Sequence, residues 1–67
     1  MNVDNILLET IRAYMGLKNC TLEPIEPPTV KEACHVKFGN GSSISVMIDL
    51  TAVYYGLDGK TYKIILH

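Results

Sequence analysis

The chain has 67 residues, a formal net charge of −1 and a hydrophobic fraction of 48%. Its six basic residues are spread along the chain, which argues against the clustered positive patch of a nucleic-acid-binding protein. No apolar run approaches the ~18 residues of a membrane span, and residues 1–17 lack the basic region and cleavage site of a signal peptide, so we expect a cytoplasmic protein with no membrane partner.

The first predicted element is a helix over residues 1–17. Asn2 or Asp4 is placed to cap its start, and Gly16 to end it in the left-handed conformation with Leu17 against its last turn. A helix this short is marginal alone, so it must pack on the rest of the chain. Its apolar residues, spaced three and four apart on one side, are Val3, Ile6, Leu7, Ile11, Tyr14 and Met15.

Residues 18–31 contain three prolines, Pro24, Pro27 and Pro28, which exclude a regular helix. We expect an extended connection here. Thr21 to Ile25 is its one candidate for a short edge strand.

Strand-forming residues resume at Glu32, and the glycines around Asn40 indicate a turn. A three-residue loop, or its five-residue equivalent, would place Phe38 opposite Ile44 and keep apolar residues on one face. Gly41 should then have a positive φ. This register turns His35 and Lys37 away from the core.

Asp58-Gly59 lies between two runs rich in β-branched and aromatic residues, which predicts a two-residue type I′ turn. Such a turn pairs Tyr55 with Tyr62 on the core face. Tyr54 would then point outward. Because outward tyrosines are common at binding surfaces, Tyr54 is a candidate contact residue.

Upstream of this hairpin, apolar residues from Ile44 onward occupy even positions, whereas the predicted core face of the hairpin uses odd ones. The alternation must shift near Leu50 to Ala52, and we favour a β-bulge in one bent strand over a tight break between two strands. Asp49 would accept a hydrogen bond from the amide freed there. In the alternative, Asp49 caps a short helix over Leu50 to Tyr55, which its aromatic and β-branched residues disfavour.

The predicted fold is therefore α+β: a helix packed on one face of a three- to four-stranded antiparallel meander over 32–67, in a single domain spanning 1–67. We find no internal repeats. A sheet covered on one face leaves the other open to a partner. The partner-binding residues predicted on this open face are Tyr54, Met47, His35, Lys37, Lys63 and Ile65.

Candidate chemical sites are sparse. Cys34 and His35 are neighbours in a strand, so their side chains point to opposite faces. With Cys20 they have no zinc-type spacing, and a Cys20–Cys34 disulfide is disfavoured in a reducing compartment. We expect no catalytic residues, no metal and no cofactor.

These observations favour a non-enzymatic protein-interaction module that binds through its open sheet face or a strand edge. Its apolar surplus indicates self-association as a homodimer, or binding to another protein. A small regulator or inhibitor encoded by a mobile element would have these features. The alternative is a nucleic-acid or small-ligand binder that uses the outward Tyr, Lys and His side chains.

Overall fold

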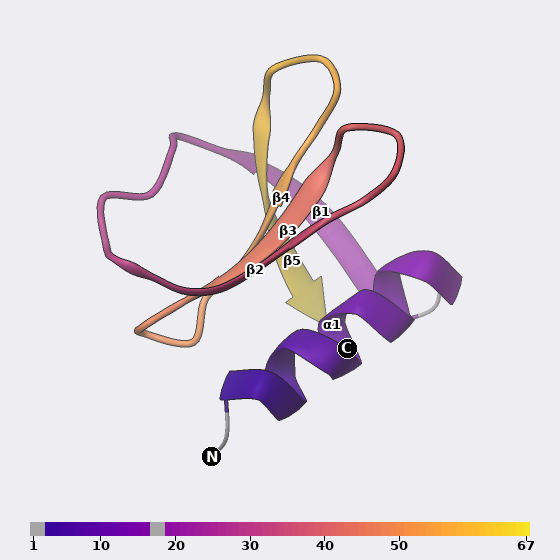
Figure 1. Cartoon of the computed structure of the whole chain (residues 1–67), viewed down its shortest axis with the longest axis vertical. Coiled ribbons are helices and arrows are strands. Elements are labelled where there is room, and N and C mark those ends of the chain that lie inside the picture. The colour runs from indigo at the N-terminus through magenta and orange to yellow at the C-terminus, as the bar shows by residue number, and fades with distance from the viewer. Residues whose placement is uncertain (1–2, 17–18) are drawn as a thin grey trace.

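The computed structural model describes residues 3–16 and 19–67. One helix lies against a five-stranded antiparallel sheet with strand order β1-β5-β4-β3-β2 (Figure 1). The class is α+β as predicted, with five strands rather than three or four. The elements are α1 (Val3–Gly16), β1 (Cys20–Ile25), β2 (Glu32–Lys37), β3 (Ser43–Met47), β4 (Ala52–Tyr55) and β5 (Thr61–Leu66).

Helix α1 covers the face of the sheet that carries the even-numbered side chains, the even face. Ile44, Ala52 and Ile64 form the buried core there, and Leu7 and Ile11 of the helix pack against them. The helix begins at Val3, so Asp4 lies in its first turn, and it ends at Gly16 as expected. The predicted roles of Asn2 and Leu17 fall outside the described residues.

One polar residue of α1 is completely buried. The Thr10 hydroxyl donates a 2.7 Å hydrogen bond to the Ile6 carbonyl, so it enters the core with its polar group satisfied.

At 14 residues the helix is too short to cross a membrane, and no helix in the described part of the chain is long and apolar enough to do so.

The proline-containing connection supplies the edge strand β1, which confirms the short strand expected near Thr21. His67 donates its backbone N–H to the Asn19 carbonyl, so the backbone N–H and C=O of Asn19 point toward β5. Because these groups alternate in direction along a strand, Pro24 lies at a position that faces away from β5. Its missing N–H therefore costs no hydrogen bond within the sheet, and it blocks this edge.

The three hairpins from β2 to β5 all have the same three-residue loop, over 39–41, 48–50 and 57–59. In each, the residues flanking the loop are joined by a backbone hydrogen bond: Phe38 with Ser42, Met47 with Thr51, and Gly56 with Lys60. The third loop residue always has a positive φ: 97° at Gly41, 71° at Leu50 and 79° at Gly59. This is a type I turn closed by a left-handed residue.

The middle residue of each loop also repeats, at nine-residue intervals. Asn40, Asp49 and Asp58 each accept a 3.0 Å hydrogen bond at Oδ1 from the backbone N–H two residues later. Asp49 thus accepts a backbone hydrogen bond as predicted, but its donor is the Thr51 N–H of a tight turn and not an amide freed by a β-bulge. The left-handed position is glycine in two loops and Leu50 in the third.

This shared loop corrects the predicted register of the last hairpin. The two-residue turn at Asp58-Gly59 is wrong, and Tyr54, not Tyr55, lies opposite Tyr62. An odd-numbered loop pairs even residues with even residues, so the alternation continues from Cys34 to the end of β5 without a shift. The bulge near Leu50 to Ala52 is therefore wrong: a tight turn breaks the chain there.

In the first hairpin the faces are as predicted but the pairing is not. Val36, rather than Phe38, lies opposite Ile44, because the loop is 39–41. Gly41 has the expected positive φ. The one register shift among the described ladders lies in β2, between Glu32 and Cys34.

The odd face of the sheet is not the open, wetted surface that we expected. Ser45 and Val53 are 0% exposed at its centre, and Met47 is 1% exposed. The strands cross at steep angles in Figure 1, as in a strongly coiled sheet. The 26–31 connection is hydrogen-bonded to the residue that follows β3, because Ile48 donates its N–H to the Lys31 carbonyl.

Candidate functional site

A tyrosine-lined groove of about 420 Å³ lies on the part of the even face that α1 leaves uncovered. We call it the tyrosine groove. Its volume falls within the range typical of small-molecule and side-chain pockets. The residues that line it include Tyr14, Leu22, Tyr54, Leu57, Asp58 and Tyr62.

The tyrosines of the groove belong to a row of four aromatic rings. Phe38 stacks on Tyr14 with centroids 5.8 Å apart, Tyr14 contacts Tyr54 at 4.7 Å, and Tyr54 contacts Tyr62 at 6.0 Å. One ring comes from the helix and three from the sheet region, so only the folded chain assembles the row. The row is an aromatic wall, and the hydroxyl group of Tyr62, at its end, donates to Asp58.

Asp58 is fixed at the rim of the groove by two hydrogen bonds. Its Oδ1 accepts the Lys60 N–H at 3.0 Å, and its Oδ2 accepts the Tyr62 hydroxyl at 2.8 Å. These bonds, in that order, lower the pKa of Asp58, and the Lys60 charge contributes less. The bond to Asp58 is also the main reason why the pKa of Tyr62 is raised.

Tyr14 is the most perturbed phenol in the groove. Burial, followed by its hydrogen bond with Tyr54 and the neighbouring Tyr54 and Cys20 charges, raises the pKa of Tyr14 to about 12. Tyr14 is therefore a neutral hydrogen-bonding group at ordinary pH, and it makes no charge of its own available to a ligand.

Two leucines leave apolar surface at the margins of the groove. Leu57 is 67% exposed, the largest value among the exposed hydrophobic residues of the described chain, and Leu22 is 38% exposed. Leu57 lies beside the 39–41 loop, since a Cβ added at Gly41 would come within 3.3 Å of its Cδ2 atom. The neighbouring hairpin thus supports an otherwise exposed side chain.

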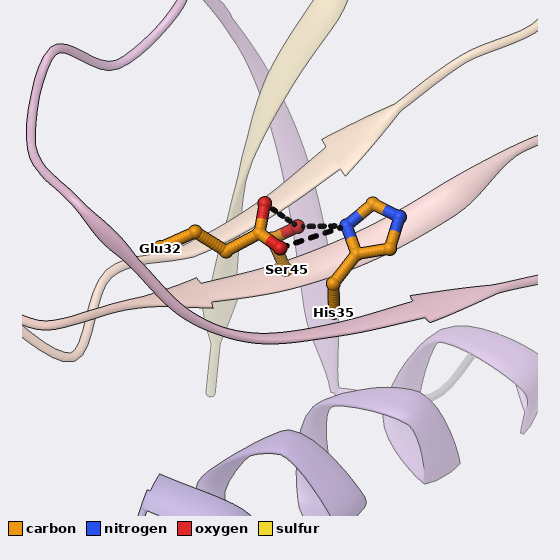
Figure 2. A network of polar contacts seen from close by, with 3 residues as sticks. All are labelled: Glu32, His35 and Ser45. Carbon is orange, nitrogen blue, oxygen red and sulfur yellow. Dashed lines mark hydrogen bonds and ion pairs between the residues drawn. The ribbon is translucent and has the colours of Figure 1, made fainter.

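A second polar cluster lies at the β2 edge and joins Glu32, His35 and Ser45 (Figure 2). His35 Nδ1 lies 2.6 Å from Ser45 Oγ and 3.3 Å from Glu32 Oε1, and the Ser45 hydroxyl donates to Glu32 Oε2 at 3.1 Å. A Ser-His-acid triad uses the two ring nitrogens separately, whereas here both partners meet Nδ1. With its hydroxyl buried, Ser45 is a structural partner in this geometry.

The structure separates the six predicted partner-binding residues. His35, Lys37 and Lys63 are exposed and belong to the odd face, as expected. Tyr54 is on the opposite face against Tyr14, Met47 is buried, and Ile65 is half-buried. Tyr54 is therefore missing from that surface, where Tyr55 lies against His35 instead, with ring centroids 6.3 Å apart.

The tyrosine groove was not predicted from the sequence. One signal in the sequence points to it: the recurrence of Asn40, Asp49 and Asp58 every nine residues, which indicates equal loop lengths. Equal three-residue loops would have placed Tyr54 and Tyr62 on the helix-covered face.

Both cysteines are free thiols. The Cys34 thiol donates to Asp4 Oδ1 at 3.2 Å, and that bond, followed by burial and the Asp4 and Glu32 charges, raises the pKa of Cys34. The Cys20 thiol points instead at the Ala13 carbonyl, 3.7 Å away. Within residues 3–16 and 19–67, no group of three or more His, Cys, Asp or Glu side chains is arranged to hold a metal ion.

In comparisons with known proteins, no family model, no curated protein and no solved structure matches this chain.

Proposed function

We propose that this protein is a non-enzymatic interaction module that binds a protein partner through the tyrosine groove. The observation that carries the proposal is the exposure of Leu57 beside a wall of three tyrosine rings in contact with one another. Tyrosine is enriched among the residues that carry binding energy at interfaces, and rigid aromatic rings lose little entropy on binding.

The proposed contact surface differs from the one that the sequence indicated. An open sheet face would have offered Tyr54 and Met47, which the fold uses in its own core regions. Two exposed apolar side chains, Leu22 and Leu57, lie at the groove instead. A regulator or inhibitor role fits a module of this size, because it can act by occupying a partner's surface.

Selection of a peptide library displayed on phage tests this proposal. The wild-type chain should enrich a consensus containing apolar residues, and Leu57→Ser should lose those peptides. Ile48→Ser is the matched control, since Ile48 is also exposed but lies in the 48–50 loop at the other end of the strands. Enriched peptides that bind the Leu57→Ser variant as well as wild type would contradict the proposal.

Self-association through the outer edge of β2 is a second candidate. Phe38 donates its backbone N–H to the Ser42 carbonyl, so its backbone groups point toward β3. Successive residues of a strand point their backbone groups in opposite directions, so those of His35 and Lys37 point away from β3. No strand among the described residues pairs with that edge. The other edge is blocked by Pro24, so an added strand would pair here.

Light scattering over a concentration series tests the second candidate. Lys37→Pro removes an outward N–H without breaking a bond within the sheet, so it should convert a dimer to a monomer while the fold persists. A wild-type chain that stays monomeric at high concentration would exclude the β2-edge dimer and leave the groove as the contact surface.

A further inference from the structure

We infer that the tyrosine groove recognises an arginine side chain presented by its protein partner. The inference rests on the proposed function and adds the chemistry of the ligand. Its basis is the combination of an aromatic wall with a single carboxylate at the rim.

Asp58 is the one charged residue among those that line the groove in the described chain. Its two carboxylate oxygens each accept one hydrogen bond from within the protein, so each keeps a free acceptor position. Those bonds also hold the carboxylate in place before any ligand arrives. A fixed carboxylate with both oxygens available is suited to a planar donor pair.

The aromatic wall narrows the choice among cations. The ring centroids of Tyr54 and Tyr62 are 6.0 Å apart, and these two rings form the part of the wall next to Asp58. A planar guanidinium group can stack flat on such rings and donate two parallel hydrogen bonds to a carboxylate, whereas an ammonium group meets both the rings and the carboxylate as a point charge. The aliphatic stem of arginine would lie against Leu57.

Amide chemical-shift titrations of the ¹⁵N-labelled full chain test the inference. The probes are the peptides acetyl-Gly-Arg-Gly-amide, its citrulline analogue, which has the same shape without the charge, and its lysine analogue. We expect the arginine peptide to shift the amides of Leu22, Tyr54 and Leu57. Its affinity should exceed that of the citrulline peptide about fivefold, as one exposed ion pair with a cation–π contact permits.

Asp58→Asn should remove this preference and leave the fold intact. Asn40 shows that an asparagine at the middle of the loop accepts the same backbone hydrogen bond. Asp49→Asn is the matched control, because it makes the same change in an equivalent turn remote from the groove, and it should keep the preference for arginine.

Three results would overturn the inference: equal affinity for arginine and citrulline, equal affinity for arginine and lysine, or no groove shifts at the solubility limit of the arginine peptide. None of these results changes the outcome of the phage selection with Leu57→Ser, which tests apolar binding at the groove irrespective of charge. Failure of the arginine assignment is thereby distinguishable from failure of the proposed function.

Discussion

His35 Nδ1 lies 2.6 Å from the hydroxyl oxygen of Ser45, which joins an exposed imidazole at the edge of the sheet to a fully buried side chain at its centre. The Ser45 hydroxyl donates its own hydrogen bond to Glu32 Oε2, so one small side chain has two hydrogen-bond partners. The hydroxyl is therefore hydrogen-bonded in a place where an unpaired polar group would be costly.

Ser45→Ala should lower the free energy of unfolding by about 1 kcal/mol. The loss is modest because His35 and Glu32 are partly exposed, and water replaces the missing hydroxyl for both. Urea unfolding monitored by circular dichroism measures the change. An unchanged midpoint would show that the cluster contributes nothing to stability.

Leu50→Gly should stabilise the protein by about 0.5 kcal/mol, an unusual sign for a leucine-to-glycine change. Leu50 has a φ of 71°, which costs an L-residue about 1–2 kcal/mol, and glycine adopts it freely at a smaller cost in entropy. Gly59→Ala is the converse control, because its φ of 79° should make alanine unfavourable although no atom lies within 4 Å. A destabilised Leu50→Gly variant would mean that the leucine side chain contributes more than the strain costs.

Gly56→Ala should displace the Asp58 carboxylate. A Cβ at this position would lie 2.7 Å from Asp58 Oδ1, closer than two such atoms approach, so the carboxylate must move. The pKa of Asp58 should then rise and that of Tyr62 should fall, as their hydrogen bond is lost. Carbon-detected NMR titration measures both, and Gly39→Ala, which meets no atom within 4 Å, should leave them unchanged.

Spectrophotometric titration should find one tyrosine that ionises last, near pH 12, because burial raises the pKa of Tyr14 to about 12. A phenol whose pKa is raised on folding stabilises the protein below its unfolded pKa, and that stability is lost as the pH rises through the folded value. Stability should therefore decline above about pH 10. Tyr14→Phe should remove the last step of the titration, and its persistence would assign that step elsewhere.

Stability should also decline in acid. Hydrogen bonds from Thr51 lower the pKa of Asp49, and those from Lys60 and Tyr62 lower that of Asp58. Carboxylates with lowered folded pKa values stabilise the protein above the unfolded pKa of about 3.9, and this stability disappears as the pH falls below it. Thermal unfolding from pH 6 to pH 2 measures the effect. The double variant Asp49→Asn with Asp58→Asn should flatten the acid limb.

The sequence alone determined the local elements of this protein. The spacing of apolar residues predicted the helix that the structure shows over Val3–Gly16, and period-two alternation predicted extended chain in the residues of β3, although the favoured interpretation joined β3 and β4 in one bent strand. These patterns reflect which side of an element is buried, so they are legible without the fold. The left-handed Gly41 was predicted from the loop length that keeps apolar residues on one face.

Only the tertiary structure decided which face each residue of the last hairpin occupies. Changing the loop from two residues to three moves every side chain of the next strand to the opposite face relative to its partner strand. The Asp58-Gly59 pair is compatible with both loop lengths. The packing of Tyr54 against Tyr14 is available only with the three-residue loop. The tyrosine groove follows from that contact between the helix and strands far along the chain, which no local pattern contains.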